Sequence, residues 1–143
     1  MRTVIFNHTF GDNVSATADN FTTLTHLDFP NTIAPNNTQW GENETMYQHF
    51  MPIAGTFKEL QVLLNNSPSA GDAYSFALRV NGVTTALSST IIGTDSSGTN
   101  FTNSVDVVAG DLVNFICIPS NAPVARKPHI TMVFESNLDN TSL

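Results

Sequence analysis

The residues whose types could do acid–base chemistry are scattered along this sequence. Glycoside hydrolysis, the clearest two-carboxylate reaction, needs a pair of acidic side chains that face each other across a sugar. Here the acidic residues stand in or beside turns rich in Gly, Asn or Ser, where aspartate routinely caps the backbone. They are Glu42, Glu44, Asp72, Asp95 and Asp111. The sequence therefore predicts no catalytic residues.

The histidines and the single cysteine form no recognisable site either. No two histidines have the spacing of zinc ligands such as H-x-x-x-H, so we expect structural imidazoles. They are His8, His26, His49 and His129. Cys117 can form no internal disulfide and lies in an apolar run, where a free thiol behaves as a small buried hydrophobe. We expect no metal, no cofactor and no enzymatic activity.

Length and charge restrict the partners. The 143 residues suffice for one domain with its own core. Five basic against twelve acidic residues give a net charge of −7, whereas proteins that bind nucleic acids cluster Lys and Arg against the phosphates. The only adjacent basic pair, Arg126-Lys127, predicts either a solvated loop or a docking contact to an acidic surface. We expect no nucleic-acid partner.

Hydropathy argues against a membrane partner. No apolar run approaches the roughly 20 residues of a membrane span. The first residues reach the polar Asn7 before any signal-peptide apolar region could form. The sequence therefore predicts a protein that is made in a cytoplasm and acts wherever it is later carried.

Alternation of apolar and polar residues predicts the fold. Residues 74–80 and 83–92 alternate on either side of Asn81-Gly82, a pair that suits the positive φ angles of a type I′ hairpin. Further strand signals recur at the spacing of a β-sandwich. They cover residues 45–54, 57–64, 73–81, 83–92, 100–108, 112–119 and 129–135. The fold class is therefore all-β, an antiparallel β-sandwich or barrel.

The sequence divides into three parts. We expect residues 1–18 to form an extended N-terminal arm, residues 19–136 to form the sandwich, and residues 137–143 to form a C-terminal tail. Within the arm, Val4, Ile5 and Phe6 offer a strand too short to fold alone, which could pair with the edge of a neighbouring molecule.

The strands and turns together resemble a known family. The run Phe-Lys-Glu-Leu-Gln-Val-Leu-Leu after Gly55, the hairpin Leu78-Arg-Val-Asn-Gly-Val and the run from Val105 through Ala-Gly-Asp are similar to jelly-roll domains of the C1q/TNF-like type. Relatives of this broad group occur in phage head and fibre proteins. The resemblance covers about residues 45–136. It implies a jelly roll that associates about a threefold axis, and it brings no catalytic residues.

Two functions fit these observations. The first is a non-enzymatic virion protein, a phage head decoration (cement) protein that binds the major capsid protein lattice as a homotrimer on the capsid exterior and stabilises it. The second is a carbohydrate- or receptor-binding module of a virion fibre or cell-surface protein. The candidate loop contacts are Trp40, Arg126 and Lys127; the indole could stack on a sugar or could plug one end of the sandwich.

Overall fold

The computed structural model describes residues 2–8, 13–24 and 40–138. His26, residues 9–12 of the predicted arm and residues 139–143 of the predicted tail lie outside this range. The described elements are β1 (Arg2–His8), β2 (Asn20–Thr22), the 3₁₀ turn η1 (Glu44–Met46), β3 (His49–Phe50), β4 (Gly55–Leu64), β5 (Ala73–Val80), β6 (Val83–Ile92), β7 (Ser97–Val107), β8 (Leu112–Ser120) and β9 (Pro128–Ser136).

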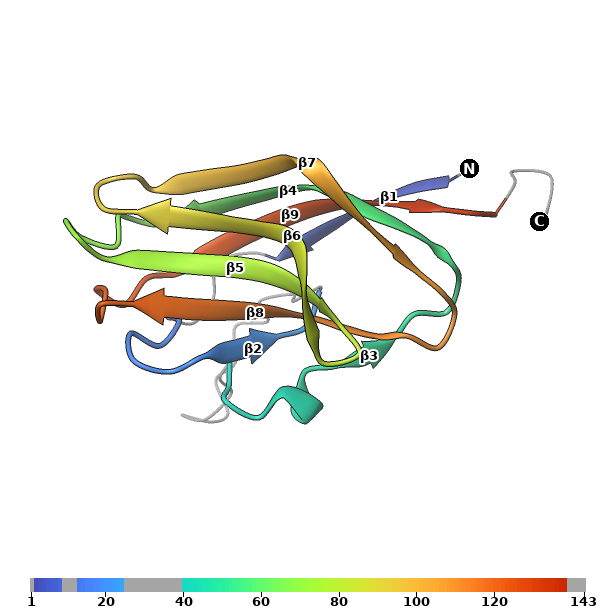
Figure 1. The fold of residues 1–143 in the computed structure, drawn as a ribbon, viewed down its shortest axis with the longest axis horizontal. Coiled ribbons are helices and arrows are strands. Elements are labelled where there is room, and N and C mark those ends of the chain that lie inside the picture. The colour runs from blue at the N-terminus through green and yellow to red at the C-terminus, as the bar shows by residue number, and fades with distance from the viewer. Residues whose placement is uncertain (1, 9–12, 25–39, 139–143) are drawn as a thin grey trace, which may run out of the picture.

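Two antiparallel sheets pack face to face, and the predicted all-β sandwich is confirmed (Figure 1). One sheet has the order β1-β9-β4-β7 and the other β2-β8-β5-β6, with the short β3 also on β8. The pairs β1–β9, β2–β8, β4–β7 and β5–β6 nest inside one another along the chain. Such nesting is the strand order of a long hairpin rolled into a jelly roll.

The core lies between the sheets and follows the predicted alternation. Every second residue of β9 is buried, including Met132 and Phe134. In β4 the alternation is interrupted at Glu59, whose φ is +56° and where the register shifts against both neighbouring strands. Because a bulge adds one residue, Phe57 and Leu60, three positions apart, both reach the core.

The Asn-Gly turn forms as the sequence predicts. Asn81 and Gly82 have φ of 52° and 76°, the two positive angles of a type I′ turn, and Val80 lies opposite Val83 across it. Leu78 is fully buried. This hairpin is local in sequence, which is why its pattern could be recognised directly.

The strand predicted over residues 45–54 is wrong. The segment instead holds the end of η1 and the two-residue β3, which is followed by Met51 and then by Pro52. The N–H of Met46 donates to the carbonyl oxygen of Asn43 (3.1 Å), which closes the 3₁₀ turn. Proline has no N–H to donate to a ladder, so this segment does not continue as a strand.

The arm takes part in the sandwich of its own chain. β1 pairs with β9 along its full length, beginning with Arg2 opposite Ser136. Val14 is buried in the core, and its N–H donates to the carbonyl oxygen of Arg126 (2.9 Å). The region 1–18 therefore contributes an edge strand and a core residue.

Candidate functional site

Four large apolar side chains are exposed at one end of the sandwich. Here the β5–β6 hairpin, β3 and the β7–β8 turn lie together (Figure 1). The four side chains are between 61% and 74% exposed. We call them the apolar end, and they are Met46, Phe50, Val83 and Val108. Exposed apolar side chains on neighbouring segments are typical of contact surfaces.

A hydrogen-bonded junction holds the hairpin against the β7–β8 turn. The Asn81 side chain donates from Nδ2 to Oδ1 of Asp111 (2.8 Å) and accepts at Oδ1 from the N–H of Leu112 (2.9 Å). The other carboxylate oxygen of Asp111 accepts from the N–H of Val108 (2.9 Å). The Val108 N–H and then the Asn81 amide lower the pKa of Asp111 below its usual value, since both bonds favour the charged form.

The same turn is tied to β3. The N–H of Met51 donates to the carbonyl oxygen of Asp111, and the N–H of Gly110 donates back to the carbonyl oxygen of Met51, both at 2.8 Å. Phe50 lies opposite Leu112 in the β3–β8 pair. The backbone beneath Phe50 and Val108 is therefore fixed by paired hydrogen bonds.

Arg79 connects the remaining parts of this end. Its guanidinium donates to both carboxylate oxygens of Glu44, at 2.6 and 3.0 Å, with the two side chains only 15% and 19% exposed. It also donates to Thr84 Oγ1 (2.6 Å) and to the carbonyl oxygen of Gly82. The guanidinium carbon lies 5.5 Å from the ring centre of Phe21 on β2. One side chain thus joins η1, the hairpin and β2, so the apolar end is rigid.

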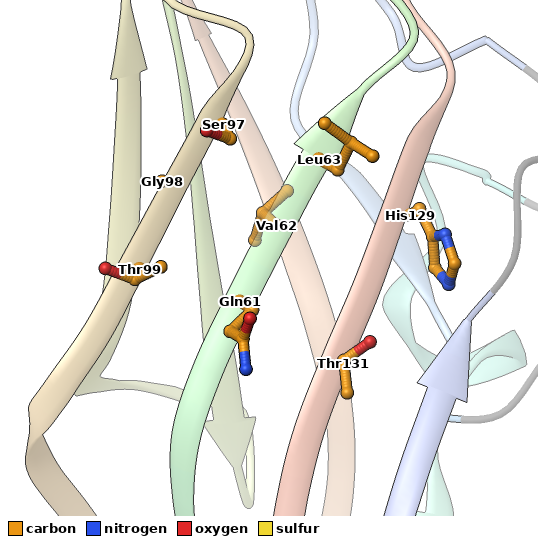
Figure 2. Close-up of a pocket in the computed structure, with 8 residues that line it drawn as sticks. All are labelled: Gln61, Val62, Leu63, Ser97, Gly98, Thr99, His129 and Thr131. Carbon is orange, nitrogen blue, oxygen red and sulfur yellow. The ribbon is translucent and has the colours of Figure 1, made fainter.

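A second feature is a shallow hollow of about 310 Å³ on the outer face of the β1-β9-β4-β7 sheet. Figure 2 shows its lining side chains on three neighbouring strands, β7, β4 and β9. They include Gln61, Thr99, His129 and Thr131. Hydroxyl and amide groups could bind a polar ligand, but none of the described residues that line the hollow is a Trp, Tyr or Phe that could stack on a sugar.

Trp40 belongs to the core. It is buried and meets the ring of Phe76 edge-on, with the ring centres 6.1 Å apart. The indole therefore fills the sandwich and is not available to stack on a sugar or to act as a loop contact at the surface. The prediction that Trp40 is a loop contact is therefore corrected: its side chain lies in the core.

The other predicted contact residues lie apart from the apolar end. Arg126 is half-buried and donates from Nε to the carbonyl oxygen of Ser67 (2.6 Å), so its guanidinium fastens the β8–β9 loop to the β4–β5 loop. Lys127 is exposed. Figure 1 places these loops at the opposite end of the molecule from the β5–β6 hairpin.

In the arm, Val4 and Ile5 are exposed on β1, and the backbone of Phe6 lies opposite Met132. No sequence pattern pointed to the four residues of the apolar end as a group. The one available signal was that Val83 and Val108 stand directly beside turn residues, where an apolar side chain is not needed for the core.

Cys117 is fully buried, as its apolar surroundings predict, and burial raises the pKa of its thiol well above the usual value. Among the described residues, no three His, Cys, Asp or Glu side chains gather closely enough to hold a metal ion. Within the same part of the chain, no helix is both long and apolar enough to cross a membrane. No protein-family model matches the sequence, and no curated protein matches it.

Proposed function

We propose that this chain is a non-enzymatic structural protein of a virus particle, a head decoration protein that binds the assembled capsid lattice as a trimer. The observation that carries the proposal is the apolar end, a group of exposed apolar side chains on segments that the Arg79 and Asp111 hydrogen bonds hold together. The strand order agrees with the jelly roll that the sequence resemblance implies. Because fold alone does not determine function, the apolar end provides the testable part.

The chemistry of this end suits a protein partner. Cores of protein interfaces are depleted in charge and rich in large apolar side chains, and Phe50 and Met46 supply such groups. The hydrogen bonds beneath them are already formed, so little ordering entropy is lost on docking. A protein that binds only the assembled lattice stabilises it by mass action. The apolar end is therefore the proposed capsid-facing surface, with the rest of the domain on the capsid exterior.

The second candidate function is a carbohydrate- or receptor-binding module. The polar hollow of Figure 2 favours it, because Gln61, Thr99 and Thr131 offer hydrogen-bonding groups on one face. Burial of Trp40 removes the stacking platform that the sequence offered to such a ligand.

Phe50→Asp tests the capsid-facing surface. The change places a charge in the proposed contact, and we expect binding to stripped particles from the same virus to weaken at least tenfold in co-sedimentation. Val124→Asp is the control, since Val124 is also an exposed apolar residue but lies in the β8–β9 loop. Equal binding by both variants would contradict the proposed surface.

Binding of the unchanged protein should survive moderate salt, because contacts without charge are little screened.

A further inference from the structure

Strand edges on this sandwich are covered unequally. The edge of β6 is covered by β7, because Asn100 Nδ2 donates to the carbonyl oxygens of Ala86 (3.2 Å) and Ser88 (2.8 Å). The edge strands β2 and β3 have only three and two residues. Very short edge strands offer little backbone to another chain.

The edge of β1 has none of these protections. β1 has seven residues, contains no proline and keeps one continuous register with β9, so no bulge turns it away. Among the described residues, no strand other than β9 pairs with it. Every second residue of an antiparallel edge strand directs its N–H and C=O away from the sheet. Within the described part of the chain, β1 therefore presents a row of backbone groups without a strand partner.

The sequence of β1 complements itself. We propose that β1 pairs antiparallel with β1 of a second copy, about a twofold axis through Ile5. In this register Val4 lies opposite Phe6 of the second copy and Thr3 opposite Asn7, so apolar positions meet apolar ones and polar positions meet polar ones. Ile5, which is 65% exposed, lies opposite itself. A contact that uses the same patch on both copies is what twofold symmetry requires.

The pairing would join two four-stranded sheets into one eight-stranded sheet. It goes beyond the proposed function and does not depend on it, because it uses a different surface from the apolar end. Antiparallel pairing of a strand with its own copy is twofold, so it cannot form the proposed trimer. Where trimers form through another surface, β1 would link neighbouring trimers.

Cysteine cross-linking tests the register directly. Because Cys117 is fully buried, a cysteine introduced on β1 is the one accessible thiol. Opposed Cα atoms in an antiparallel pair are about 4.5–5.5 Å apart, within disulfide range. Ile5→Cys should therefore oxidise to a covalent dimer, whereas Thr3→Cys alone should not, since two copies of residue 3 would lie about 14 Å apart. A mixture of Thr3→Cys and Asn7→Cys should cross-link.

Ile92→Cys is the matched control, because Ile92 is 59% exposed but lies on β6. Cross-linking of Ile92→Cys or of Thr3→Cys at the rate of Ile5→Cys would overturn the proposed register. Sedimentation gives the second measurement, in which the unchanged chain should dimerise. Val4→Lys should raise the dissociation constant of the dimer at least tenfold more than Val124→Lys does. The two valines start from nearly equal exposure, 48% and 47%. If the unchanged chain forms no β1–β1 pair at its highest soluble concentration, the proposal is wrong. That result would leave the proposed particle binding through Phe50 unaffected.

Discussion

Arg79→Ala should lower the free energy of unfolding by about 2–3 kcal/mol. Removing one partner of a buried ion pair costs more than the pair contributes, because the remaining charge is left without a counterion. Here the Glu44 side chain, 19% exposed in the intact protein, would lose its counterion, and Thr84 and the carbonyl of Gly82 would lose a donor. The expected loss lies at or below the lower end of the range for fully buried pairs, about 3 kcal/mol, because both side chains retain some contact with water. Urea unfolding measures the loss.

The Lys58–Glu135 ion pair provides the control for Arg79. Its nitrogen and oxygen are 2.8 Å apart, but the two side chains are more exposed and share one contact. Exposed ion pairs contribute little because water and salt screen them. Lys58→Ala should therefore change the unfolding free energy much less than Arg79→Ala. Equal losses would contradict the connecting role given to Arg79.

Gly55→Ala should lower the free energy of unfolding by about 2–3 kcal/mol, the upper part of the range for overpacked cores. A Cβ at Gly55 would lie 2.3 Å from Cζ of Phe134 and 2.4 Å from the backbone oxygen of Glu135. Neither group can turn away, since one is a packed core ring and the other belongs to the β4–β9 ladder. The two strands would have to separate at this point. Thermal and urea unfolding of the variant measure the effect.

Gly98→Ala is the matched control for Gly55→Ala. Its Cβ would also make a contact of 2.4 Å, but with Oγ of Ser89, the far end of a side chain that can rotate. We therefore expect a clearly smaller loss of stability at Gly98 than at Gly55. An equal loss at the two positions would show that the β4–β9 spacing is not the limiting feature.

Much of the fold could be predicted because its signals are local. Asn81-Gly82 specifies its own turn, and the alternation along β9 specifies which face is buried. The bulge at Glu59 could not be predicted, since its positive φ follows from the need to place both Phe57 and Leu60 in the core. The pairing of β1 with β9 joins the two ends of the chain, and no local pattern specifies such a partner.

The candidate site was less predictable for the same reason. The apolar end combines residues from η1, β3, the hairpin and the β7–β8 turn, which Arg79 and Asp111 bring together by side-chain bonds. From the sequence alone, Phe50 cannot be distinguished from a core residue. The strand predicted over residues 45–54 did not indicate that its side chain is exposed. Trp40, the more conspicuous residue, lies in the core.

Thermal release of particles tests the proposed capsid role most directly. Particles stripped of this protein should release their contents at a lower temperature than complete particles, because the lattice loses the binding free energy of its decoration. Adding back the purified chain should restore the release temperature, and adding back Phe50→Asp should not. Equal release temperatures with and without the protein would contradict the decoration role, and binding of a carbohydrate or receptor would become the better account.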